Sequence, residues 1–383
     1  MSETGLKWKG VDLDEVFLRP KDANLIPGHV DFAKLYTWGS NDSGQLGLPN
    51  GGGGATINRS SPVQIGTDTN WKNISFGDNS TIAIKTNGTL WSWGDNINGE
   101  LGQNDRIDRS SPVQVGTDTN WKNISMALGH TLATKTDGTL WSWGSGTALG
   151  HGDIIFKSSP VQVGTDTNWK NISAGSSFSF AIKTNGTLWS WGSNGQGQLG
   201  QNDTTTKSSP VQVGTDTDWK YVAAGASATL AIKENGTLWA WGRNSTTSPV
   251  SQLGLNDTIF RSSPVQVGTD ADWEYIFIFD TGVAIKTNGT LWMWGQNNFG
   301  QLGQNDTINR SSPVQVGTAT NWKRGASAPL HTIGLKTDGT LWSWGGNTLG
   351  QLGQNDRINR SSPVQVGTAT NWKQINNRGA LSF

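Results

Sequence analysis

The chain has 383 residues, of which 33% are apolar and none is cysteine, and its 29 basic residues balance its 29 acidic ones. This charge balance argues against the basic field that nucleic-acid binding requires, and the lack of cysteine excludes disulfides, thiolate metal sites and cysteine nucleophiles. We therefore expect no nucleic acid as a partner. No signal peptide is visible and no apolar stretch approaches 18 residues, so we expect no membrane span.

Residues 1–31 precede the repeated part of the chain and are predicted to form a docking arm. Asp12 can cap a short helix whose Leu13, Val16 and Phe17 share one face before Pro20 ends it. A single helical turn cannot bury such a face by itself. The arm therefore docks either on another molecule or along the side of its own repeat domain.

Residues 32–383 are predicted to be one domain made of repeats. The stretch Gly-Thr-Leu-Trp-Ser-Trp-Gly at 88–94 recurs in close copies about 50 residues apart, a period typical of propeller blades or solenoid turns. Seven tryptophans mark its Trp-Gly step: Trp38, Trp93, Trp143, Trp191, Trp241, Trp294 and Trp344. A Ser-Ser-Pro-Val step and a second tryptophan step each recur seven times as well.

Each unit is predicted to contain four short strands, because the segments alternate with period two and are rich in β-branched and aromatic residues. In the first unit these strands are 63–66, 71–75, 81–85 and 89–93. Asn-Gly or Asp-Gly between the last two strands is typical of a two-residue hairpin turn. No segment has a sustained helical period, so we expect antiparallel sheets.

The two ends of the repeat complement each other, which indicates a closed ring. Residues 34–39 match only the last strand of a unit, and residues 363–383 match its earlier strands. Joining the two makes a last blade and removes the unpaired edges of an open array. We therefore predict an all-β fold: a seven-bladed β-propeller of four-stranded antiparallel blades, closed by pairing of the N- and C-terminal strands.

The repeat resembles that of the regulator of chromosome condensation family. The resemblance is carried by Gly-Thr-Leu-Trp-Ser-Trp-Gly, by Gly-Gln-Leu-Gly as at 44–47 and by Ser-Pro-Val, and it covers residues 34–383. It implies a seven-bladed propeller. The family's functions include nucleotide exchange, ultraviolet sensing and β-lactamase inhibition, and none of them transfers residue by residue.

The arm carries a second resemblance. Residues 10–17, Gly-Val-Asp-Leu-Asp-Glu-Val-Phe, are similar to a stretch near the start of some tailed-bacteriophage structural proteins. This resemblance implies a non-enzymatic structural or adhesive virion component in the tail, fibre, baseplate or capsid decoration, held to other virion proteins by the arm. The alternative is a bacterial protein-interaction or inhibitor module in the cytoplasm.

No catalytic, cofactor or metal site is predicted. The four histidines lack metal-ligand spacing, and the loop aspartates recur once per unit, so they cannot form an acid and base pair. Each aspartate precedes a basic residue by four positions, as in Asp105 and Arg109. We expect these pairs to order the loops, and a calcium loop is the alternative.

The repeats differ most in the loops after each Trp-Gly step. There the chain presents Ile155, Phe156, Ile259, Phe260 and Phe299. Exposed aromatic residues on the loops of a rigid scaffold are candidate binding anchors, and we predict that they contact a host surface protein or glycan. The competing interpretation is that they pack against the neighbouring blade.

Overall fold

The computed structural model describes residues 33–48, 57–245, 252–376 and 379–382. The chain divides into two compact units, Met1–Asp31 and Phe32–Phe383, and every described residue belongs to the second. The predicted docking residues Leu13, Val16 and Phe17 lie outside the described residues. The described part of the second unit is all-β apart from one short 3-10 helix, η1 (Gly146–Ala148).

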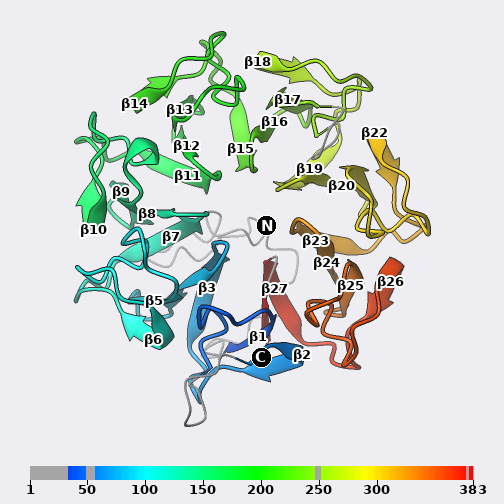
Figure 1. Ribbon diagram of the computed structural model, residues 1–383. Coiled ribbons are helices and arrows are strands. Elements are labelled where there is room, and N and C mark those ends of the chain that lie inside the picture. Colours follow the sequence, from blue (N-terminus) through cyan, green and yellow to red (C-terminus); the bar gives the residue numbers. More distant parts are fainter. Residues whose placement is uncertain (1–32, 49–56, 246–251, 377–378, 383) are drawn as a thin grey trace, which may run out of the picture. The chain divides into compact units, whose positions relative to one another are not determined.

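The strands form seven four-stranded antiparallel sheets arranged in a ring (Figure 1). The innermost strands are β3 (Trp71–Phe76), β7 (Trp121–Met126), β11 (Trp169–Ala174), β15 (Trp219–Ala224), β19 (Trp273–Ile278), β23 (Trp322–Ser327) and β27 (Trp372–Asn376). The second strands are β4 (Ser80–Lys85), β8 (His130–Lys135), β12 (Phe178–Lys183), β16 (Ala228–Lys233), β20 (Thr281–Lys286), β24 (His331–Lys336) and β28 (Gly379–Ser382).

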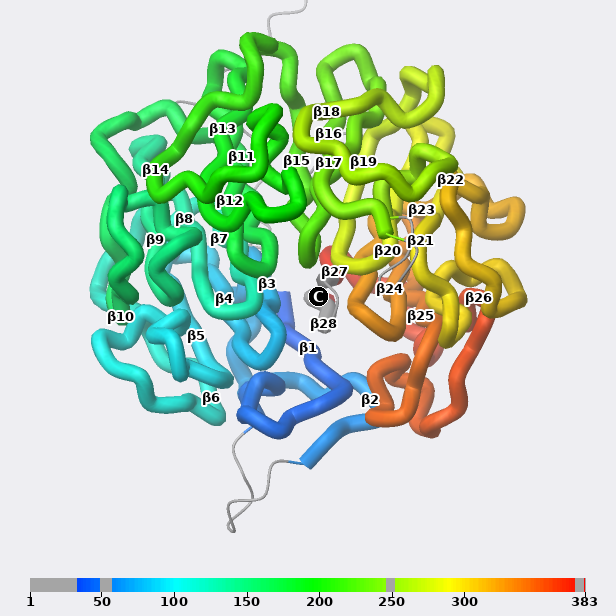
Figure 2. The backbone as a smooth tube through the Cα atoms, turned by 45° about the horizontal axis from the view of Figure 1, so that its top comes forward, coloured from blue at the N-terminus to red at the C-terminus, as the bar shows by residue number. Residues whose placement is uncertain are grey.

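The third strands carry the Leu-Trp-x-Trp-Gly pattern or its Tyr36 variant. They are β5 (Leu90–Gly94), β9 (Leu140–Gly144), β13 (Leu188–Gly192), β17 (Leu238–Gly242), β21 (Leu291–Gly295), β25 (Leu341–Gly345) and β1 (Lys34–Gly39). The outer strands are β6 (Arg109–Gln114), β10 (Lys157–Gln162), β14 (Lys207–Gln212), β18 (Arg261–Gln266), β22 (Arg310–Gln315), β26 (Arg360–Gln365) and β2 (Arg59–Gln64). Figure 2 shows the same ring tilted, with β3, β7, β15, β19 and β27 around its middle.

The predicted strands at 71–75, 81–85 and 89–93 are confirmed to within one residue at each end. The turn between the last two is set by Gly88, whose φ of +77° is costly for any residue with a Cβ atom. The strand predicted at 63–66 runs instead from Arg59 to Gln64. It ends early because Gly66 lies in a turn at φ +55°, where its carbonyl oxygen accepts a hydrogen bond from the Gln64 side chain.

The predicted composition of the blades is wrong. The sequence predicts seven equivalent blades that each begin with the Ser-Ser-Pro-Val strand, the last one made of residues 34–39 and 363–383. Instead, six blades each contain four consecutive strands, from β3-β4-β5-β6 to β23-β24-β25-β26. The remaining sheet, β2-β1-β28-β27, is not a repeat of that kind, because it combines two strands from each end of the chain. We call it the composite sheet.

The reason is that each Ser-Ser-Pro-Val strand pairs with the tryptophan strand before it in the chain. Val113 of β6 lies opposite Ser92 of β5, and Pro112 lies in this outermost strand. Proline has no N–H to donate and is tolerated at a sheet edge. The strand at 360–365 therefore completes the sheet of β25, and the composite sheet takes Arg59–Gln64 as its outer strand.

Buried tryptophans join neighbouring sheets. The Trp93 side chain is fully buried, and its indole N–H donates to the Gln45 carbonyl oxygen of the preceding sheet at 3.0 Å. Trp38 donates in the same way to the Gln351 carbonyl oxygen at 2.9 Å. Both junctions of the composite sheet thus use one type of bond, and the ring is closed.

Candidate functional site

Six loops at the outer end of the sheets share one construction. We call 105–109, 153–157, 203–207, 257–261, 306–310 and 356–360 the rim loops; each leads from a third strand into an outer strand. Every rim loop begins with aspartate and ends with arginine or lysine. Because the last residue of each rim loop begins an outer strand, the geometry inside the loop decides what projects into solvent.

The first rim loop shows how the aspartate orders the backbone. One Asp105 carboxylate oxygen accepts from the Arg109 guanidinium at 2.6 Å. The other accepts from the Ile107 backbone N–H and from the Asn96 side-chain amide, both at 3.1 Å. Arg109 also donates to the Ile107 carbonyl oxygen at 2.7 Å. The N–H and the carbonyl oxygen of Ile107 are thus both hydrogen-bonded within the loop, and its side chain projects into solvent.

The same ion pair forms in all six rim loops, which confirms the predicted pairs. The distances are 2.6 Å for Asp105 and Arg109, 3.1 Å for Asp153 and Lys157, 2.7 Å for Asp203 and Lys207, 2.5 Å for Asp257 and Arg261, and 2.6 Å for both Asp306 with Arg310 and Asp356 with Arg360. These carboxylates are engaged by N–H donors. Among the described residues, no group of three His, Cys, Asp or Glu side chains is placed to hold a metal ion.

These contacts favour the ionised form of Asp105 and of Asp356. The Ile107 N–H, and then the Arg109 guanidinium, hold the pKa of Asp105 below its ordinary value. In Asp356 the Arg360 guanidinium is the larger cause and the Ile358 N–H the second, again with a lowered pKa. The two carboxylates therefore keep their ion pairs throughout the neutral pH range.

Each rim loop is also tied to the next blade. The residue before the aspartate donates its backbone N–H to a serine carbonyl oxygen of the neighbouring outer strand, as from Asn104 to Ser158 at 2.7 Å. The bond from Asn355 to Ser60, also 2.7 Å, continues this pattern into the composite sheet. The rim loops therefore form a connected and rigid set.

An exposed isoleucine occupies the third position of five rim loops. Ile107, Ile155, Ile259, Ile308 and Ile358 are 62% to 65% exposed, and Thr205 takes this position in the sixth loop. Ile57, at the equivalent position before β2, is 55% exposed. Only Ile155 and Ile259 were predicted from the sequence, because they lie where the repeats differ. The other isoleucines were missed, although their place two residues before each Arg is readable in the sequence.

The predicted aromatic residues fall into two groups. Phe156 and Phe260 follow isoleucines in rim loops and are 43% and 47% exposed. The Arg106 guanidinium lies 5.0 Å from the centre of the Phe156 ring, so adjacent rim loops contact each other. Four of the five predicted residues, Ile155, Phe156, Ile259 and Phe260, therefore occupy equivalent exposed positions in two rim loops. Their role as anchors stays a prediction.

Phe299 does not belong to this set. It lies earlier in its loop, before the Gly300 turn, and is half-buried. A Cβ atom on Gly346 of the next sheet would lie 3.5 Å from the Phe299 Cβ atom. For this residue the competing interpretation, packing toward the neighbouring blade, fits the structure.

Comparisons with known proteins agree on the fold. The model of the RCC1-like domain matches residues 31–278, and the model of the regulator of chromosome condensation (RCC1) repeat matches residues 288–334 and 338–376. A mitochondrial RCC1 domain-containing protein of Arabidopsis thaliana, RUG3, is 35% identical over 85 residues, which are 20% of this chain and 18% of that protein.

Solved structures are similar over nearly the whole chain. Prp20p of Saccharomyces cerevisiae, described with its binding properties to Gsp1p and histones, has a TM-score of 0.80 at 17% identity and covers 92% of both chains. Human WBSCR16 has a TM-score of 0.77 at 18% identity and covers 91% of this chain and 98% of its own. At such identities the likeness concerns the fold alone.

Proposed function

Because the chain belongs to the RCC1-like family, we propose that it is a non-enzymatic scaffold that binds a protein partner through its rim loops. The observation that carries this proposal is the set of exposed isoleucines, each held by an aspartate that bonds its own loop. An anchor that is already ordered loses little conformational entropy on binding. Together with Phe156 and Phe260, these side chains supply apolar anchors on a rigid rim.

The partners of similar structures support a protein as the partner of this chain. Prp20p is described with Gsp1p and histones, and a second structure shows Kap60 bound to yeast RCC1 (Prp20). Gsp1p, histones and Kap60 are partners of those proteins, and we do not assign them to this chain. This chain has a formal net charge of zero, so apolar contacts rather than a basic field are the expected basis of its binding.

We retain the virion component as the finer proposal. It rests on residues 10–17, which lie outside the described residues, together with the repeat composition. Quantitative mass spectrometry of particles banded from the source tests it: a fixed ratio to a major capsid or tail protein supports it. Absence from particles, with abundance in cells, would leave the bacterial interaction module.

The rim loops provide their own matched control. Residues 203–207 hold the same Asp203 contacts, with Lys207 at 2.7 Å and the Thr205 N–H at 3.0 Å, but carry Thr205 and Thr206 where 257–261 carry Ile259 and Phe260. The double substitution Ile259→Thr and Phe260→Thr therefore copies a loop that the fold already accepts.

We expect this double variant to fold normally and to lose partner binding at least tenfold, since removing apolar anchors costs about 1 to 4 kcal/mol. The partner is first identified by capture on the wild-type chain and then titrated in purified form. The control substitution Thr205→Ser should leave the dissociation constant unchanged. The double substitution can also be combined in one protein with the corresponding changes of Ile155 and Phe156 to Thr. Undiminished binding by that combined variant would refute the proposal.

A further inference from the structure

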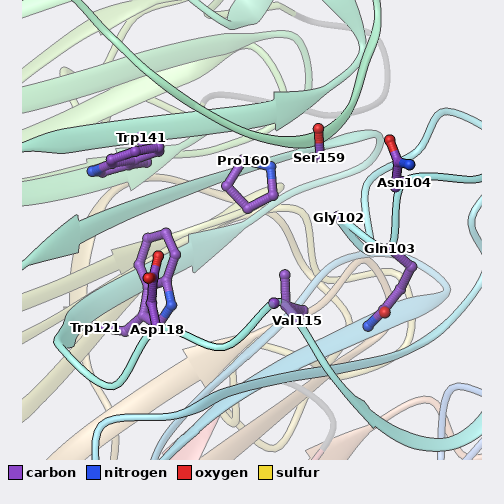
Figure 3. Close-up of a pocket in the computed structure, with 10 residues that line it drawn as sticks. Gly102, Gln103, Asn104, Val115, Asp118, Trp121, Trp141, Ser159 and Pro160 are labelled. Carbon is purple, nitrogen blue, oxygen red and sulfur yellow. The ribbon is translucent and has the colours of Figure 1, made fainter.

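Crevices between neighbouring blades recur with the same residue types. One of about 380 Å³ lies between the sheet β3-β4-β5-β6 and the sheet β7-β8-β9-β10, and a second of about 370 Å³ lies between β11-β12-β13-β14 and β15-β16-β17-β18. In Figure 3, Trp121 and Trp141 stand at one end of the first crevice, Gln103 and Asn104 at the other, and Pro160 between them. The second crevice has Trp219, Trp239, Gln201, Asn202 and Pro264 in the same roles.

The tryptophan end is a fixed apolar surface. Trp141 is half-buried, and its indole N–H donates to the Thr139 hydroxyl at 2.9 Å. The Lys135 ammonium lies 3.8 Å from the centre of one Trp141 ring, and Trp121 packs against Trp141 edge-to-face with centroids 5.9 Å apart. These contacts hold the Trp141 plane in place without a ligand. Pro160 adds a second flat apolar group.

Polar side chains around this surface have donors and acceptors that are not used in hydrogen bonds to the described residues. The Asn104 and Ser159 side chains make no hydrogen bond to the described part of the chain. The Gln103 amide nitrogen donates to Val113 and Ser92, which leaves its carbonyl oxygen as an acceptor. One Asp118 carboxylate oxygen pairs with the Lys135 ammonium at 2.8 Å, and the other remains an acceptor.

One of the tryptophans that line each crevice carries a buried donor. The Trp121 indole N–H has no hydrogen-bond partner among the described residues, and the same is true of Trp219 in the second crevice. It is true of the first tryptophan of every innermost strand: Trp71, Trp121, Trp169, Trp219, Trp273, Trp322 and Trp372. A buried donor without a partner costs free energy, and a ligand oxygen that reached it would remove that cost.

We propose that these crevices bind neutral carbohydrate, one or two sugar units in each. The C–H face of a sugar ring matches the apolar surfaces of Trp141 and Pro160, and its hydroxyl groups both donate and accept, as the mixed set of side chains requires. The ion pair of Asp118 and Lys135 leaves the site without net charge, which favours a neutral sugar over an acidic one.

A proline-rich peptide fits less well. Such peptides also dock on aromatic surfaces, but proline carries no N–H, so the peptide would leave the acceptors of Gln103 and Asp118 unpaired. Carbohydrate satisfies acceptors and donors alike. Because equivalent crevices lie on one ring, a repetitive oligosaccharide would also gain affinity by occupying several of them.

The test measures stoichiometry as well as affinity. Isothermal titration with maltose, cellobiose and N,N′-diacetylchitobiose, together with a glycan array, is expected to reveal saturable binding at about 1 mM per site. Substitutions Ser159→Phe and Ser263→Phe place a ring in one crevice each, on outer strands where aromatic residues are well tolerated. Each should lower the number of sites by one and leave the dissociation constant of the remaining sites unchanged.

Two further results bear on the proposal. Thr205→Phe, which adds a ring to a rim loop outside the crevices, should leave the number of sites unchanged. Unaltered stoichiometry in both serine variants would overturn the proposal, and so would an absence of binding to all three disaccharides and the array. Binding of poly-L-proline without sugar binding would overturn it in favour of a peptide groove. These outcomes are independent of the rim-loop substitutions, so the two proposals can fail separately.

Discussion

His130 makes the stability of the propeller depend on pH in a way that can be worked out. It lies on β8, is 1% exposed, and places its Nε2 atom 2.9 Å from the Ser179 hydroxyl of the neighbouring blade. Ser179 donates its own proton to the Ala148 carbonyl oxygen at 2.8 Å, so it accepts from His130. The native imidazole is thus neutral and protonated at Nε2, and burial lowers the pKa of His130 to about 4.

The sign of the effect follows from proton binding. In the unfolded chain the pKa of His130 is 6.5. Between pH 6.5 and about 4 the unfolded chain binds this proton and the folded chain does not, so the free energy of unfolding falls as the pH falls through this window. The gap between the two pKa values, at about 1.4 kcal/mol per unit, amounts to about 3 kcal/mol lost by pH 4. At pH 5 the loss is about 2 kcal/mol.

The variant His130→Gln isolates this term, because glutamine keeps an N–H donor for Ser179 but does not titrate. Urea unfolding of both proteins is measured at pH 7.5 and at pH 5. All other groups titrate alike in the two proteins, so the difference in slope belongs to His130. We expect the wild type to lose about 2 kcal/mol more than the variant over this interval. Equal losses in both proteins would refute the buried, neutral histidine.

Three further changes test other parts of the repeat by urea unfolding. Burial raises the pKa of Glu100, so the free energy of unfolding falls as the pH rises from 4.5 through the folded-state pKa. Glu100→Gln should remove this slope and stabilise the protein at pH 8, and an unchanged slope contradicts it. Ala319→Asp should give Lys336 the carboxylate that other blades provide and add up to about 1 kcal/mol, and a loss of stability would contradict that pairing. Gly138 has φ +78°, and a Cβ atom there would lie 2.0 Å from the Thr167 carbonyl oxygen. Gly138→Ala should therefore cost at least about 2 kcal/mol, and an unchanged urea midpoint would contradict the turn geometry.

Much of the fold was predictable because each local signal has a strict structural meaning. The Asn87-Gly88 step accepts positive φ, and period-two alternation defines the flanking strands Ser80–Lys85 and Leu90–Gly94. The Asp105 and Arg109 pair was also readable, since both residues lie in one short loop. The positions of all the rim-loop isoleucines were also readable in the aligned repeats, although only Ile155 and Ile259 were predicted as binding residues.

The sequence by itself determined the repeat, its strands and its hairpin turns, because these depend on residues close together in the chain. The partial units at 34–39 and 363–383 also indicated that the two ends meet. Only the tertiary structure decided which sheet each Ser-Ser-Pro-Val strand joins, so that β2 and β1 pair with β28 and β27. It also separated Phe299 from Phe156 and Phe260, and it formed the crevice above Trp121 from two blades. The physical reason is the same in each case: strand edges, side-chain burial and crevices are set by contacts between different strands and blades. Near-identical repeats leave the choice among these contacts open until the ring closes.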